Sequence, residues 1–244
     1  MPRVLFITTE NLHGTSGATI STAELVRAMA DSEAIDLSLI APAPDGPSPV
    51  PDSVSTYWLT PKPAGTIKWH LKHQPSMARA LLTALIRERP DEVIIRIGPS
   101  TVIPIALGVL PGVEYKALVR GIVHRNLSIQ RPVKAAVWAN ATVADEAFAS
   151  FEAVAEMLAE LGVDREVKVI PNAVTPERFS PVDGSPPESI ASVTADAEFV
   201  IGFVGTMEER HRVDVLVEAV ASLPDSMKTA LVLVGDGPQR AKLE

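Results

Sequence analysis

The stretch FVIGFVG at residues 199–205 is followed by the charged loop TMEERHR at 206–212, by VDVLVEAV at 213–220 and, further on, by LVLVGDGP at 231–238. Both apolar runs end in glycine, and the segment between them has the apolar spacing of an amphipathic helix. This order predicts a strand, a turn, a helix and a second strand that is parallel to the first.

The glycines that close these two predicted strands fall at the same edge of the sheet. In an open α/β sheet, ligands bind beyond the carboxyl ends of the strands. A helix that begins at this edge offers free backbone N–H groups and a partial positive charge, and both suit a phosphate. We therefore expect Gly205 and Gly235 to lie beside a phosphate-bearing ligand.

Short apolar runs also alternate with helical patterns in the preceding part of the chain. Strands are predicted at residues 4–8, 35–40, 56–59, 92–97, 115–119 and 167–170. A helix is predicted between an N-cap at Ser150 and a closing Gly162. The alternation predicts an α/β, Rossmann-like domain, in which a mostly parallel sheet of at least six strands has helices on both faces.

The best candidate for a linker is the segment 180–197. It contains three prolines, Gly184 and hardly any large apolar residue. We expect a complete Rossmann-like domain at residues 1–179, this linker at 180–197, and the incomplete start of a second Rossmann-like domain at 198–244.

Charge and composition exclude several classes of protein. A formal net charge of −8 disfavours nucleic acid as a partner. The chain contains no cysteine, so it has neither disulfides nor thiolate chemistry. No apolar stretch reaches the roughly 20 residues of a membrane-spanning helix, and the first residues do not form a signal-peptide core. The expected location is the cytoplasm.

Residues 62–89 are basic in an otherwise acidic chain. They include six lysines or arginines, two histidines and Trp69, but only one acid, Glu88. Two interpretations are open: a helix with its charged side in water, or a peripheral contact with anionic lipid at the inner face of the membrane, with Trp69 at the interface.

Four stretches resemble family 4 of the retaining GT-B glycosyltransferases. VIPNAV at 169–174 with ERF at 177–179 is similar to the segment at the domain crossover, and VGDGP at 234–238 is similar to a recurring turn of the second domain. KALVRG at 116–121 resembles the strand that lines the cleft, and Gly14 and Gly17 resemble the glycine-rich first loop.

This resemblance implies a hexosyltransferase of GT-B fold that uses a nucleotide-diphosphate sugar. The acceptor would be a glycan, a lipid or a small molecule, the configuration would be retained, and neither a metal nor another cofactor would be needed. Arg120 is implied as the catalytic residue. The implied donor-binding residues are Gly14, Gly17, Gly205, Thr206, Arg210, His211, Arg212, Gly235 and Gly237.

The sequence departs from the family pattern at the donor diphosphate. Thr206 and His211 stand where the family usually has an arginine and a lysine, and Arg210 and Arg212 flank the position. The loss of one charge-assisted hydrogen bond costs about 1.5–3 kcal/mol. Two alternatives therefore stay open: a non-catalytic binding protein derived from a glycosyltransferase, and a nucleotide-sugar 2-epimerase of the same fold. A nicotinamide-dependent oxidoreductase is disfavoured, because the first strand is not followed by Gly-x-Gly-x-x-Gly.

The family segment with two glutamates that contact the donor sugar is not found in residues 1–244. We therefore expect the chain to be truncated at its carboxyl end. We also expect residues 1–244 alone not to transfer sugar, and to bind a donor no more tightly than about millimolar, or roughly 4 kcal/mol.

Overall fold

A computed structural model describes residues 1–14, 16–61, 69, 72–98, 111–121, 130–174, 176–179 and 184–243. The chain divides into two compact units, unit 1 at residues 1–173 and unit 2 at residues 174–244. The sequence places the end of the first domain somewhat later, at residue 179.

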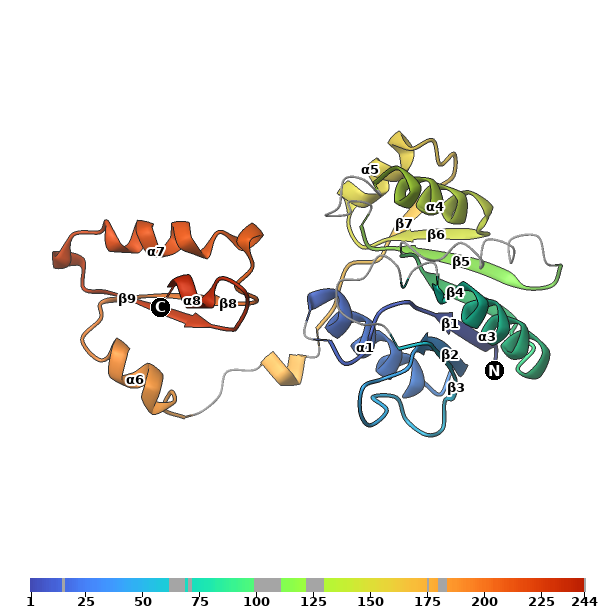
Figure 1. Ribbon diagram of the computed structural model, residues 1–244, viewed down its shortest axis with the longest axis horizontal. Helices are drawn as coiled ribbons and strands as arrows, with labels where there is room; N and C mark the ends of the chain where they lie inside the picture. The colour runs from blue at the N-terminus through green and yellow to red at the C-terminus, as the bar shows by residue number, and fades with distance from the viewer. Residues whose placement is uncertain are drawn as a thin grey trace. The chain divides into compact units, whose positions relative to one another are not determined.

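Unit 1 is built on a seven-stranded sheet in which all neighbouring strands are parallel (Figure 1). Its strands are β1 Arg3–Ile7, β2 Asp36–Pro42, β3 Ser55–Leu59, β4 Glu92–Arg96, β5 Glu114–Val119, β6 Glu146–Ala149 and β7 Val167–Val169. The predicted parallel sheet is therefore confirmed. The sequence missed β6, because its four residues include two alanines and no β-branched side chain.

The strand order β3-β2-β1-β4-β5-β6-β7 places a topological switch between β1 and β4. From β1 the chain builds the sheet in one direction through β2 and β3, and then returns to the other side of β1 with β4. Ligands of open α/β sheets bind in the crevice at such a point, beyond the carboxyl ends of the strands. The ends of β1 and β4 are therefore the first place to look for a site.

Helices cover both faces of this sheet, as predicted. Successive side chains of a strand point to opposite faces, so Val4 and Phe6 of β1 share one buried cluster with α1 Gly17–Ala30. Leu5 and Ile7 lie in a second buried cluster on the other face. The helices of that second cluster are α3 Gln74–Arg87, α4 Gln130–Val143 and α5 Glu152–Glu160.

The predicted N-cap of α5 is wrong by one residue. Phe151 occupies the cap position and makes no side-chain capping bond. The Ser150 N–H still donates to Val119 O of β5 at 3.2 Å, so Ser150 extends the ladder of β6 rather than beginning the helix. The predicted helix end is confirmed: Gly162 has a φ of +84°, and its N–H donates to Ala159 O at 2.9 Å.

Unit 2 contains the predicted strand, turn, helix and parallel strand. β8 Phe199–Val204 pairs with β9 Thr229–Val234 over six residues, and α7 Val213–Ala221 connects them. The short helix α8 Arg240–Leu243 follows. A further helix, α6 Glu188–Thr194, lies within the range assigned to the linker and contacts β9. The proline- and serine-rich composition gave no sign of this helix.

The described residues include no helix that is both long enough and apolar enough to cross a membrane.

The start of β1 is held to the loop before β4 by Arg3 and Asp91. The Arg3 backbone N–H and Nη2 donate to the two Asp91 carboxylate oxygens at 2.9 and 2.7 Å. These bonds lower the pKa of Asp91 to about 2. The stabilisation is present above the usual carboxyl range near pH 4 and is lost as the pH falls toward 2.

We expect the difference in urea midpoint between wild type and Asp91→Asn to shrink between pH 5 and pH 2. A difference that stays constant would contradict this linkage.

Candidate functional site

Polar residues follow the strands that flank the topological switch. Thr9 and Glu10 follow β1 after one intervening residue, Arg96 is the last residue of β4, and Arg120 comes directly after β5. An added Cβ at Gly98, two residues beyond β4, would lie 2.8 Å from Thr9 Oγ1, so the ends of β1 and β4 are in close contact. The topology thus brings one carboxylate and two guanidinium groups to a single sheet edge.

Arg96 is buried at this edge, with only 5% of its surface exposed. Its Nη1 donates to Glu10 Oε1 at 2.9 Å, and the Glu10 side chain is 22% exposed. Its Nε is also buried and has no hydrogen-bond partner among the described residues. Arg96 is not among the site residues that the sequence predicts. The available signal was a cation inside an otherwise apolar strand, where an isolated charge is costly.

Arg120, the implied catalytic residue, lies half-buried beside this pair. Its Nη1 donates to Ser21 Oγ of α1 at 2.5 Å. Its buried Nε has no hydrogen-bond partner in the described part of the chain. Burial, and secondarily the charge of Arg96, lower the pKa of the Arg120 guanidinium. The positive charge of Arg96 therefore acts on the Arg120 guanidinium.

The two glycines of the first loop differ in their surroundings. An added Cβ at Gly14 would lie 2.9 Å from Thr19 Oγ1, so packing explains this glycine. Gly17 is the first residue of α1, and an added Cβ there would meet no described residue within 4 Å. The helix is capped by Ser16, whose Oγ accepts from the Thr19 N–H at 3.2 Å. Open space therefore remains at Gly17, at the N-terminus of α1.

In unit 2, Gly235 and Gly237 hold two turns in contact. Their φ angles are +150° and +154°. An added Cβ at Gly235 would lie 1.9 Å from Gly205 O, and one at Gly237 would lie 2.7 Å from Met207 O. The Met207 N–H donates across the contact to Asp236 O at 2.8 Å. Backbone packing thus accounts for both glycines, and their contact with a donor stays a prediction.

Thr206 and His211 lie together in the turn after β8. His211 Nδ1 is 2.5 Å from Thr206 O and 3.4 Å from Thr206 Oγ1. Since a carbonyl oxygen can only accept, Nδ1 carries the proton, and Nε2 is left for another partner. His211 is exposed and precedes the N-terminus of α7 by two residues. The turn therefore places a histidine where a phosphate would meet the start of a helix.

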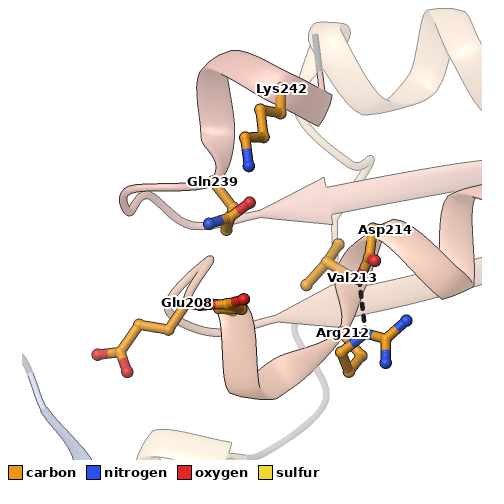
Figure 2. A pocket seen from close by; sticks show the side chains of 7 residues that line it. Glu208, Arg212, Val213, Asp214, Gln239 and Lys242 are labelled. Carbon is orange, nitrogen blue, oxygen red and sulfur yellow. Dashed lines mark hydrogen bonds and ion pairs between the residues drawn. The ribbon is translucent and has the colours of Figure 1, made fainter.

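Arg210 and Arg212 are each paired with an acid. Arg210 Nε donates to Glu208 Oε2 at 2.8 Å, and Arg212 Nε donates to Asp214 Oδ1 at 3.2 Å. Figure 2 shows the pair of Arg212 and Asp214 in a cavity of about 310 Å³ beside α7. The residues that line this cavity are Glu208, Glu209, Arg212, Val213, Asp214, Gln239 and Lys242. With three carboxylates against two cations, the cavity does not favour a diphosphate.

The basic segment does not present Trp69 to a membrane. Trp69 is 5% exposed, its Nε1 donates to Thr60 O at 3.2 Å, and its ring stacks on the buried His73 at 3.9 Å between centroids. The expectation of an interfacial Trp69 is therefore wrong. Most of residues 62–71 lie outside the described residues. Within α3, Arg79 is exposed, as are Leu82 and Ile86, which are 61% and 64% exposed.

The described residues contain no group of three or more histidine, aspartate or glutamate side chains placed to hold a metal ion.

The sheet topology of unit 1 is the Rossmann-like fold of a GT-B N-terminal domain. The model of the glycosyl transferase 4-like domain matches residues 16–173, and the chain belongs to this family. No curated protein sequence matches the chain.

Solved structures show the same fold. Sucrose-phosphate synthase from Thermosynechococcus elongatus is 17% identical with a TM-score of 0.75, and the match covers 100% of this chain and 65% of that one. The catalytic domain of starch synthase IV from Arabidopsis thaliana, bound to ADP and acarbose, is 12% identical with a TM-score of 0.66 and coverages of 97% and 69%. A Listeria monocytogenes protein described as a UDP-N-acetylglucosamine 2-epimerase is 14% identical with a TM-score of 0.62 and coverages of 95% and 61%.

Proposed function

We propose that the protein is a glycosyltransferase that moves a hexose from a nucleotide-diphosphate sugar to an acceptor, with retention of configuration. Membership in the glycosyl transferase 4-like family supports this proposal. The observation that carries it is the convergence of Glu10, Arg96 and Arg120 at the topological switch of unit 1, where α/β sheets of this kind bind their ligands.

The proposed chemistry needs no metal and no covalent intermediate on the protein. The acceptor oxygen bonds to the anomeric carbon on the face from which the nucleotide diphosphate departs, and the acceptor proton passes to a phosphate oxygen of the leaving group. The protein then contributes positioning and stabilisation of the charge that develops on that group. In unit 2, Thr206 and His211 would serve the diphosphate, with Gly205 at the end of β8. In unit 1, Gly17 and Arg120 would line the approach of the substrate.

The test is turnover by the protein isolated from its native cells, with a panel of UDP-, GDP- and ADP-sugars. We expect one sugar nucleotide to support release of its nucleotide diphosphate, and the release to depend on an acceptor and to persist in EDTA. Consumption of no sugar nucleotide, together with tight binding of one of them, would support a non-catalytic binding protein instead. Loss of activity in EDTA would contradict the metal-free mechanism.

A second candidate is a nucleotide-sugar 2-epimerase, which the structural likeness to the Listeria monocytogenes protein favours. The two reactions differ in their products. An epimerase forms a new nucleotide sugar without any acceptor, whereas a transferase releases the nucleotide diphosphate and forms a glycoside. Chromatography of the sugar-nucleotide pool therefore separates the two.

The assignment of His211 to the donor site is tested by substitution. We predict that His211→Ala weakens the binding of a nucleotide sugar about 5- to 10-fold, because the polar contact of this ring with the diphosphate is lost. Ligand-observed NMR measures the affinity. Unchanged affinity in His211→Ala would exclude His211 from the site.

We also propose a peripheral contact between α3 and anionic lipid. Arg79, Leu82 and Ile86 are spaced so that they share one exposed face of the helix. We expect vesicles with anionic lipid to recruit the protein and high salt to release it. Arg79→Glu should weaken the recruitment, whereas the control variant Arg27→Glu on α1 should not. Equal recruitment by neutral vesicles would contradict a role for charge.

A further inference from the structure

Arg96 and Arg120 have more hydrogen-bond donors than the described residues satisfy. A guanidinium carries five N–H groups. In each of these two arginines one Nη group has a partner, Glu10 or Ser21, while the buried Nε has none among the described residues. Buried donors in native proteins almost always have partners, so each exception calls for an explanation.

The charges at this edge do not balance. Glu10 pairs with Arg96 at 2.9 Å, but the partner of Arg120 is the neutral hydroxyl of Ser21. Among the described residues that the topology brings to this edge, one carboxylate therefore stands against two guanidinium groups, and the charge of Arg96 acts on Arg120. An anion placed between them would relieve their repulsion and satisfy the free N–H groups.

Further donors lie at the same edge of the sheet. Ser150 follows β6, the neighbour of β5, and its backbone N–H bonds to Val119 O, directly before Arg120. The Ser150 hydroxyl is buried, with no partner in the described part of the chain. Open space at Gly17 adds the N-terminus of α1, which Arg120 contacts through Ser21. The guanidinium groups, the hydroxyl and the helix N-terminus are all hydrogen-bond donors that suit the oxygens of a phosphate or a carboxylate.

We infer that Arg96 and Arg120 form an oxyanion-binding pair, which selects an acceptor that carries a phosphate or carboxylate group. The assignment of the anion to the acceptor rests on the proposed function, whereas the anion site itself is argued from the contacts of unit 1 alone. The contrast with unit 2 supports the assignment to the acceptor. There, Arg210 and Arg212 are neutralised by Glu208 and Asp214, so the unbalanced pair of guanidinium groups belongs to unit 1.

The first arm of the test measures binding of inorganic phosphate to the full chain, by titration calorimetry or NMR. We expect Arg120→Gln to weaken phosphate at least 10-fold, because charge-assisted hydrogen bonds are lost. Because Arg120→Gln leaves no buried carboxylate without its partner, we expect this variant to fold. Arg27→Gln is the matched control: it removes an exposed arginine of α1 that pairs with Glu24, and it should leave phosphate binding unchanged.

The second arm identifies the source of the anion. Glucose 6-phosphate and glucuronate should each bind at least 10-fold more tightly than glucose, and Arg120→Gln should abolish the preference. The tighter of the two charged sugars shows whether phosphate or carboxylate is preferred. Arg96→Lys keeps the charge beside Glu10 but loses the fork, and should weaken the charged sugars in a folded protein.

Three results would overturn the inference. They are equal affinity for glucose and both charged sugars, unchanged phosphate binding in a folded Arg120→Gln variant, and displacement of phosphate by a nucleotide sugar, which would assign the pair to the donor. Failure of the proposed function is a separate result. The protein could bind phosphate through Arg120 and yet consume no nucleotide sugar. This result would support the anion site and exclude transferase activity.

Discussion

Replacement of Gly235 by alanine is expected to unfold unit 2 while unit 1 keeps its structure. The added Cβ would lie 1.9 Å from Gly205 O, and the φ of +150° is one that alanine rarely adopts. Backbone strain of this kind costs about 1–3 kcal/mol, and overpacking costs a further 1–3 kcal/mol. The turns after β8 and β9 would have to separate, which would break the bond between Met207 N and Asp236 O.

Hydrogen exchange followed by mass spectrometry reports the two units separately. We expect peptides of β8 and β9 to lose protection in Gly235→Ala, and peptides of β1 and β4 to keep it. Gly202→Ala is the matched control, because it lies in β8 and its added Cβ would meet nothing within 4 Å. Retained protection of β8 and β9 in Gly235→Ala would show that the two turns do not need their close contact.

Replacement of Arg96 by methionine is expected to destabilise unit 1 by about 3 kcal/mol, the lower end of the cost of leaving one partner of a buried ion pair. The Glu10 carboxylate, which is only 22% exposed, would lose the guanidinium that neutralises it. The double variant Arg96→Met with Glu10→Gln removes both charges and should recover most of the stability.

Urea unfolding gives the two free energies. The exposed pair of Arg3 and Asp91 supplies the matched control, since Arg3→Gln removes an arginine in contact with solvent and should lower stability far less than Arg96→Met does. A loss below about 1 kcal/mol in Arg96→Met would show that Glu10 is well solvated without Arg96. No recovery in the double variant would show that packing of Arg96, rather than its charge, stabilises the edge.

Much of the fold follows from local patterns. The apolar run at residues 4–8 has the composition of a buried parallel strand, and β1 contains it except for its last residue. The glycine after the apolar run at 199–204 correctly marks the end of β8. The short β6 and the helix α6 were missed, because four alanine-rich residues and a proline-rich segment carry no such pattern.

The candidate site could be predicted only in part. Arg120 was found because it ends an apolar strand, whereas Arg96 lies one residue before the end of its apolar run and was overlooked. The roles of Gly235 and Arg212 depend on contacts that sequence spacing does not fix. Gly235 meets a carbonyl of the neighbouring turn, and Arg212 turns toward Asp214, two residues on, instead of standing free for a phosphate.

The most direct test of sugar transfer with retention is proton NMR of the anomeric hydrogen during turnover by the protein isolated from its native cells. The donor is the sugar nucleotide that the protein consumes, and the acceptor carries the preferred anionic group. We predict a new glycoside whose anomeric configuration is that of the donor from the first detectable product onward. A product of inverted configuration, or an epimerised nucleotide sugar with no glycoside, would contradict it.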